Sequence, residues 1–290
     1  MSVEPFQDAV EELYSRLTPC RVCPRNCEVD RLRGEQGYCK IGAEPLVASA
    51  SPHHGEEPCL VGRGGSGTIF LSGCNLMCSF CQNYRISHGA EGSPTGVDGL
   101  VELMFRLQKR GCENINFVTP SHVVPWLADA VRQARLDGLN VPIVYNSGGY
   151  DSVETLRLLE GTVDIYMPDI KFWSSDPAER YCGAEDYPEV MKQAVKEMHR
   201  QVGDLEIRHG VARRGLLVRH LVMPEDVAGT HDILDFLADD ISAQTWVNVM
   251  EQYRPCYEAS QFAEIARRPS RKEVRAAREH AEVLGLNLAG

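Results

Sequence analysis

The 290-residue sequence has little positive charge, no long apolar run and no recognisable export signal. Its 30 Lys and Arg residues are outnumbered by 41 Asp and Glu residues, which gives a net charge of −11. Because nucleic-acid binding usually requires a basic surface, we expect no nucleic-acid partner. No apolar segment approaches the roughly 18 residues that cross a bilayer, so we expect no membrane partner either. The N-terminal stretch MSVEPFQDAVEEL is acidic and amphipathic, unlike a secretory signal, and we expect a cytoplasmic protein.

Cysteine is what the sequence has in excess. Eight of the 11 cysteines lie between residues 20 and 81, and the remaining three are scattered. In a chain without an export signal, such a concentration favours metal or redox chemistry over a disulfide framework.

The most informative group is GCNLMCSFCQN, which spaces Cys74, Cys78 and Cys81 as C-x3-C-x2-C. Thiolates are soft ligands that suit iron–sulfur clusters and zinc. Three thiolates can hold three irons of a [4Fe–4S] cluster and leave the fourth iron open to a substrate or cofactor. A structural zinc completed by a distant residue is the alternative.

A second group comprises Cys20, Cys23, Cys27 and Cys39. Four thiolates close the coordination shell of zinc, and an iron–sulfur cluster is equally compatible with the ligand type. The other possibility is that these four remain ordinary thiols. For Cys182 and Cys256 we expect ordinary thiols.

The hydrophobic periodicity predicts six short apolar strands, each followed by a helix. The strands are expected near 68–72, 114–118, 141–146, 163–172, 215–224 and 245–250, with helices near 97–110, 123–137, 151–160, 188–202, 228–239 and 270–285. This alternation is typical of an α/β fold with a parallel sheet. Six units are too few for a closed eight-fold barrel, so we expect an open or partial barrel, with a doubly wound sheet as the alternative. Residues 1–60, with a helix at 5–17 and the cysteine-rich stretch, would form an extension to a domain at 61–290.

In parallel folds of this kind the chemistry gathers where strands end. The polar residues that follow the predicted strands are therefore candidate site residues: Thr119, Ser147, Asp169, Lys171 and Arg254.

C-x3-C-x-Phe-C after a strand is similar to the signature of radical S-adenosylmethionine enzymes. Further blocks at 53–89, 145–172 and 247–255 resemble the PflX-type branch of proteins akin to pyruvate formate-lyase activating enzyme. The resemblance implies a partial (β/α)6 barrel, one [4Fe–4S] cluster held by Cys74, Cys78 and Cys81, and bound S-adenosylmethionine. It also implies an electron donor such as flavodoxin or ferredoxin.

The resemblance assigns roles to individual residues. Phe80 would line the adenine, with a packed core aromatic as the alternative. Thr119 stands where the activating enzymes carry a Gly-Gly-Glu element, and Ser147 matches an element near the methionine carboxylate or ribose. Lys171 would neutralise the carboxylate of S-adenosylmethionine and Asp169 would accept from its ammonium, with a surface ion pair as the alternative. Arg254 would contact the ribose, adenine or substrate.

The predicted function is reductive cleavage of S-adenosylmethionine to a 5′-deoxyadenosyl radical, which abstracts hydrogen from a substrate. That substrate would be a glycyl radical enzyme, as for an activase, or alternatively a small molecule or peptide. A non-catalytic iron–sulfur electron-transfer protein is the third interpretation.

Overall fold

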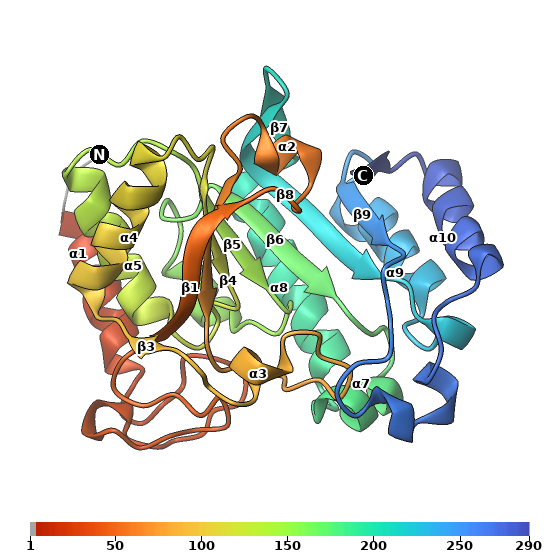
Figure 1. Ribbon diagram of the computed structural model, residues 1–290, viewed down its shortest axis with the longest axis horizontal. Coiled ribbons are helices and arrows are strands. Elements are labelled where there is room, and N and C mark those ends of the chain that lie inside the picture. Colours follow the sequence, from red (N-terminus) through yellow and green to blue (C-terminus); the bar gives the residue numbers. More distant parts are fainter. Residues whose placement is uncertain (1–3, 290) are drawn as a thin grey trace.

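The computed structural model describes residues 4–289 and shows one sheet with helices around it (Figure 1). Its central strands are parallel and neighbour one another in chain order: β2 (Ser66–Leu71), β4 (Ile115–Val118), β5 (Ile143–Ser147), β6 (Ile165–Ile170), β8 (Val211–Leu221) and β9 (Trp246–Met250). A doubly wound sheet would reverse its strand order at a switch point. The sequential order therefore confirms the partial barrel, and the sheet is not closed.

Four further strands lie at the margins of the parallel sheet. β1 (Leu46–His53) pairs antiparallel with β2 and carries the short β3 (Ser93–Pro94), while β7 (Glu206–Arg208) pairs antiparallel with β8, and β10 (Asn287–Leu288) parallel with β9. The periodicity did not predict β1, whose sequence LVASASPH consists largely of small or polar residues. This strand lies on the N-terminal side of the boundary expected near residue 60, yet it belongs to the same sheet as β2.

Most helices occur where the sequence predicts them: α1 (Glu4–Ser15), α4 (Val97–Lys109), α5 (Val124–Leu136), α6 (Val153–Arg157), α8 (Tyr187–Val202), α9 (Thr230–Phe236) and α10 (Arg271–Val283). The short α2 (Pro58–Val61) and α3 (Tyr84–Ser87) were not predicted. Neither was α7 (Ser175–Cys182), because its sequence SDPAERYC is mostly polar. None of the helices in residues 4–289 is both long and apolar enough to cross a membrane.

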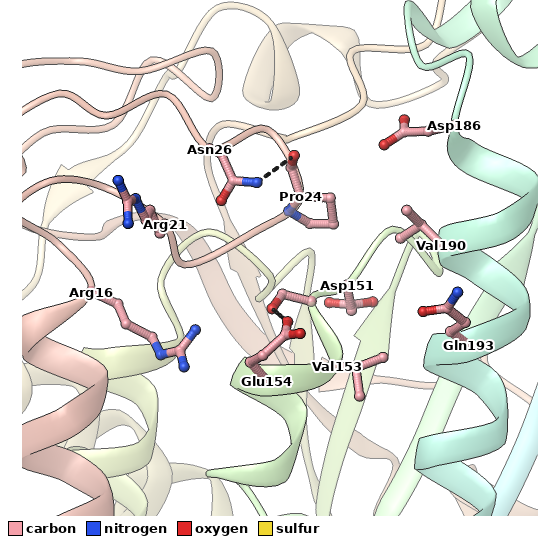
Figure 2. A pocket seen from close by; sticks show the side chains of 11 residues that line it. Arg16, Arg21, Pro24, Asn26, Asp151, Val153, Glu154, Asp186, Val190 and Gln193 are labelled. Carbon is pink, nitrogen blue, oxygen red and sulfur yellow. Dashed lines mark hydrogen bonds between the residues drawn. The ribbon is translucent and has the colours of Figure 1, made fainter.

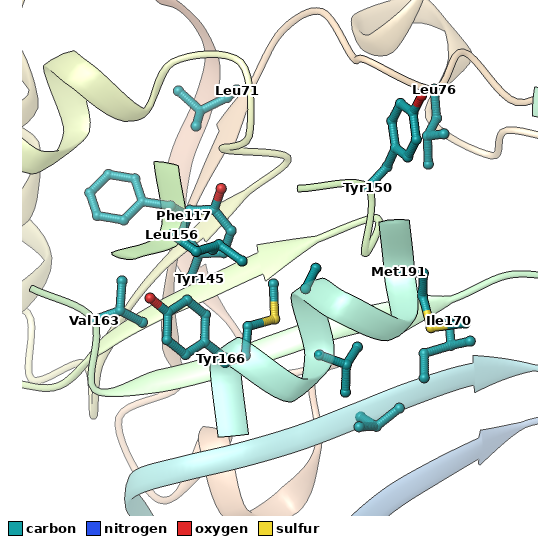
Figure 3. Packing of buried hydrophobic residues seen from close by; sticks show 14 of the residues in the cluster. Leu71, Leu76, Phe117, Tyr145, Tyr150, Leu156, Val163, Tyr166, Ile170 and Met191 are labelled. Carbon is teal, nitrogen blue, oxygen red and sulfur yellow. The ribbon is translucent and has the colours of Figure 1, made fainter. Parts of the chain in front are cut away.

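Two hydrophobic clusters lie on opposite faces of the barrel wall. The larger fills the space between strands and helices, where Tyr145 and Tyr166 pack with Leu156 and Met191 (Figure 3). The smaller contains the alternate residues of the same strands, whose side chains point to the other face of the sheet. They include Val144, Met167 and Leu217, and Leu60 of α2 packs with them. Since side chains alternate along a strand, this smaller cluster occupies the barrel interior. It fills one end of the interior and leaves the carboxyl ends of the strands for polar side chains.

Candidate active site

A cavity of about 470 Å³ opens at the carboxyl ends of the parallel strands. All six of these strands, or the loops that follow them, contribute to its wall. Every predicted cluster and cofactor residue except Arg254 lines it: Cys74, Cys78, Phe80, Cys81, Thr119, Ser147, Asp169 and Lys171. Residues chosen because they follow strands, although nearly 100 positions apart in the sequence, thus lie in the wall of one cavity.

The loop after β2 carries the three cysteines in a backbone that needs unusual conformations. Gly73 has φ +79° and Met77 has φ +50°. A Cβ on Gly73 would lie 2.5 Å from the Cys39 carbonyl oxygen, so the cysteine-rich N-terminal segment packs directly against this loop. Burial raises the pKa of Cys74 to about 12 and also raises that of Cys81. Because a buried thiolate is costly without a cation, these donors suit iron.

Asp169 and Lys171 form an ion pair at the end of β6, with Lys171 Nζ 3.1 Å from Asp169 Oδ2. Burial disfavours the Lys171 ammonium, but the charges of Asp169 and the Cys78 thiolate outweigh this effect and hold the Lys171 pKa well above its usual value. Asp169 Oδ1 is buried and has no hydrogen-bond partner. The pair thus presents a cation and a free acceptor to the same cavity.

The loop after β5 is held close to the cluster loop. Ser147 Oγ donates to Asp151 at 2.7 Å and accepts from the Gly149 N–H at 3.1 Å. A Cβ on Gly148 would lie 2.8 Å from Leu76 and 3.5 Å from Lys171 Cε. A side chain at this position would displace Leu76, so the glycine keeps this backbone close to the cluster loop.

Thr119 follows β4 with φ +62°, a left-handed conformation that is rare for a β-branched residue. Such strain costs on the order of 1–3 kcal/mol and concentrates at functional sites. The Thr119 N–H donates to the Asn146 carbonyl at 2.8 Å, which fixes the strained turn to the neighbouring strand.

Phe80 lines the cavity and also packs in the core. Its ring lies edge-on to Phe172, with 5.8 Å between centroids, and 6.2 Å from Tyr253. Arg254 is exposed and does not line the cavity, whereas Gln252 does. Tyr253 is buried and donates to the Ile265 carbonyl at 2.7 Å, and this anchoring leaves Arg254 pointing to solvent.

The sequence profile of the radical SAM superfamily matches residues 68–236, which are more than half of the chain and run from within β2 to the end of α9. The chain belongs to the radical SAM superfamily. An uncharacterized protein of Methanocaldococcus jannaschii is 34% identical over 281 residues, covering 93% of this chain and 76% of that protein. A crystal structure of a radical SAM methyltransferase from Sphaerobacter thermophilus superposes with a TM-score of 0.50 at 15% identity. The superposition covers 77% of this chain, which spans 65% of that structure, and shows similarity of fold alone.

Membership of the radical SAM superfamily implies a [4Fe–4S] cluster and S-adenosylmethionine. Among the described residues, no three Cys, His, Asp or Glu side chains converge on a point where a single metal ion would fit. A [4Fe–4S] cluster does not need such a point, because each of its cysteines binds a different iron. Three thiols on one cavity wall, facing a lysine and an unpartnered carboxylate oxygen, suit both groups.

The four N-terminal cysteines of this radical SAM chain do not line the cavity. Cys20, Cys23 and Cys39 are buried and Cys27 is half-buried. Burial raises the pKa of Cys23, and the charges of Cys39, Cys20 and Cys27 add smaller contributions in the same direction. Among the described residues, these four thiols do not converge on a single-ion site. A metal at these residues remains a prediction.

Sequence reasoning missed a charged cluster in the cavity wall beside Asp169, whose partner across the β6–β8 strand pair is Arg219. Arg219 of β8 donates to both carboxylate oxygens of Glu57 at 2.7 Å and also contacts Glu56. Asn248 of β9 donates to Glu57 at 2.8 Å. Glu57 lies just before α2, so this cluster joins the segment after β1 to the far strands across the open side of the barrel. One signal was available, namely an arginine within the otherwise apolar run GLLVRHLVMP.

A second cavity, of about 420 Å³, lies between the N-terminal segment and α8 (Figure 2). Arg16, Arg21 and Asn26 face Asp186 and Gln193 across it. None of the predicted site residues lines this cavity. Its connection to the first cavity is Asp151, which accepts from Ser147.

Proposed function

We propose that the protein cleaves S-adenosylmethionine reductively and uses the resulting radical to abstract hydrogen from a substrate in the 470 Å³ cavity. The observation that carries the proposal is the convergence of three cysteines, Asp169 and Lys171 on that one cavity. When bound, the cluster would supply the electron that breaks the sulfonium bond and releases the 5′-deoxyadenosyl radical. Its ligands would be Cys74, Cys78 and Cys81.

The chain's own residues bind and orient S-adenosylmethionine in this proposal. Lys171 Nζ neutralises the carboxylate of the methionine moiety, and the unpartnered Asp169 Oδ1 accepts from its ammonium. Ser147 and the strained Thr119 contribute polar groups from the two neighbouring strands. Phe80 presents its ring and backbone to the adenine.

The hydrogen donor in the proposal is a glycyl radical enzyme, as the resemblance to activating enzymes suggests. The second substrate class is a small molecule or peptide, since the Gly-Gly-Glu element of the activases is replaced here by Val118-Thr119-Pro120. A flavodoxin or ferredoxin would deliver the electron. Transfer of deuterium from labelled candidate substrates into 5′-deoxyadenosine identifies the donor.

The experiment that tests the proposal is anaerobic reconstitution with iron and sulfide, followed by dithionite and S-adenosylmethionine. We expect 5′-deoxyadenosine and methionine as products, and a reconstituted chain that yields neither contradicts the proposal. Lys171→Ala should weaken S-adenosylmethionine binding by about 10- to 100-fold in equilibrium dialysis, because it loses a charge-assisted contact. The matched control is Lys196→Ala, which removes a half-exposed lysine paired with Asp240.

We also propose a metal at Cys20, Cys23, Cys27 and Cys39, on the ground that four cysteines lie within 20 residues and three of them are buried. Elemental analysis of a variant with Cys74, Cys78 and Cys81 replaced by alanine tests this site separately. Retained zinc or iron supports it, and a variant with neither contradicts it.

A further inference from the structure

One thiol outside the cysteine triad lies in contact with a proposed cluster ligand. Cys182, the last residue of α7, is 2% exposed, and its Sγ lies 3.2 Å from Cys78 Sγ. Cys182 does not line the cavity. An iron-bound thiolate has no proton to give, so in the loaded protein Cys182 is the donor of this contact.

We propose that Cys182 is a positioning residue of the cluster, whose S–H donates to the Cys78 sulfur and raises the cluster's reduction potential. The inference rests on the proposed function, which places the cluster on Cys78. Hydrogen bonds to ligand sulfurs are among the factors that set the potential of an iron–sulfur cluster, because they stabilise the extra negative charge of the reduced form.

The other two cysteines of the triad each have a donor of their own. The Leu76 N–H donates to Cys74 Sγ at 3.4 Å. Cys81 Sγ accepts from the backbone N–H of Asn83, and Ser87 Oγ, which donates to the Asn83 carbonyl at 3.1 Å, lies 3.2 Å from the same sulfur. Cys182 supplies the donor for the third sulfur, so each ligand sulfur receives at least one hydrogen bond.

The backbone holds Cys182 beside Cys78. The Ser79 N–H, one residue after Cys78, donates to the carbonyl of Tyr181, one residue before Cys182, at 2.8 Å. This bond fixes the end of α7 to the cluster loop at the position of the sulfur contact.

Arg25 of the N-terminal segment ties the same two elements together. Its guanidinium donates to the Cys182 carbonyl at 2.9 Å and to the Asn75 carbonyl at 2.7 Å, and it also contacts the Gly183 carbonyl. The guanidinium carbon lies 3.9 Å from the centroid of the Tyr38 ring. The contact between Cys182 and Cys78 is therefore braced from two sides.

The test is a redox titration of the reconstituted holoenzyme, monitored by electron paramagnetic resonance, with iron and sulfide measured on the same samples. The variants are Cys182→Ala, Cys182→Ser and Cys112→Ala, the last being a matched control that removes an equally buried thiol. We expect all of them to hold the same iron as the wild type. The midpoint potential should fall in Cys182→Ala, fall less in Cys182→Ser because serine retains a donor, and stay unchanged in Cys112→Ala.

Equal potentials in the wild type and Cys182→Ala would overturn the inference. So would a selective loss of iron in Cys182→Ala, because that would make Cys182 a ligand. Should Cys182→Ala not fold, Cys182→Val, which fills the space but has no donor, decides, and a potential equal to that of the wild type counts against the inference. A wild-type chain that takes up no cluster or makes no 5′-deoxyadenosine contradicts the proposed function instead.

Discussion

The two cysteine groups of this chain have similar spacing and similar burial, but different surroundings. Cys74, Cys78 and Cys81 line a cavity that also contains Lys171 and the carboxylates of Glu56, Glu57 and Asp169, and each sulfur has a hydrogen-bond donor. Cys20 and Cys39 share the large hydrophobic cluster with Cys78 but lie away from that cavity. The difference shows that cysteine spacing identifies possible ligands, whereas the groups that surround the sulfurs decide what chemistry they can serve.

The N-terminal cysteine segment nevertheless supports the cluster loop. Arg25 joins that loop to α7, and the carbonyl of Cys39 packs on Gly73. Arg31 is buried, lies over Trp126 and donates to the carbonyl of His122. The segment that we expected to be an extension therefore forms part of the wall behind the site.

The largest difference between the two groups should appear on removing single sulfurs. Cys78→Ala should abolish reductive cleavage of S-adenosylmethionine, because the cluster loses one of its three ligands. Cys27→Ala, in the other group, should retain cleavage in the folded protein. The measurement is 5′-deoxyadenosine formed per chain under dithionite. Equal loss in both variants would show that the ligands are misassigned.

Removal of Arg25 should weaken the support that the N-terminal segment gives to the cluster loop. Arg25→Ala loses its charge-assisted hydrogen bonds to carbonyl oxygens, and we expect the free energy of unfolding to fall by about 2–3 kcal/mol. Arg21→Ala, which removes only an exposed pair with Glu28, should change it by less than about 0.5 kcal/mol. Anaerobic urea titrations measure the free energy of unfolding of both variants. Equal losses would contradict the conclusion that Arg25 supports the cluster loop.

The smallest effect, when taken over one pH unit, concerns His122 and its contact with the N-terminal segment. Burial, together with the nearby Arg31, lowers the pKa of His122 to about 3. Between that value and the ordinary pKa of about 6.5, the unfolded chain binds a proton that the folded chain does not, so folding stability falls as the pH falls. The contribution of this one group is at most about 1.4 kcal/mol per pH unit.

His122→Asn should therefore flatten the pH dependence of the free energy of unfolding between pH 6.5 and 4. The exposed His209→Asn variant is the control and should leave that slope unchanged. An identical slope in His122→Asn and the wild type would contradict the assignment of a neutral, buried imidazole.

Much of the fold was predictable because β2, β4, β5 and β6 are buried on both faces and appear in the sequence as continuous hydrophobic segments. β1 was not predicted because a strand at the edge of the parallel sheet needs few apolar residues. Its backbone hydrogen bonds to β2 stabilise it instead. α7 was not predicted because its sequence is mostly polar and buries only Ala178, Tyr181 and Cys182. In the site, Asp169 and Lys171 were predictable from their place at a strand end, but the same rule wrongly favoured Arg254 as a residue of the cavity wall.

The sequence by itself determined the local features: the spacing of Cys74, Cys78 and Cys81, the alternation of strands and helices, and the polar residues at the strand ends. Only the tertiary structure decided which distant groups surround them. Cys182 is 104 residues from Cys78, and Glu57 is 162 residues from Arg219. Such pairs leave no periodic or spacing signal, because they form only when the parallel strands bring remote segments to the same end of the barrel.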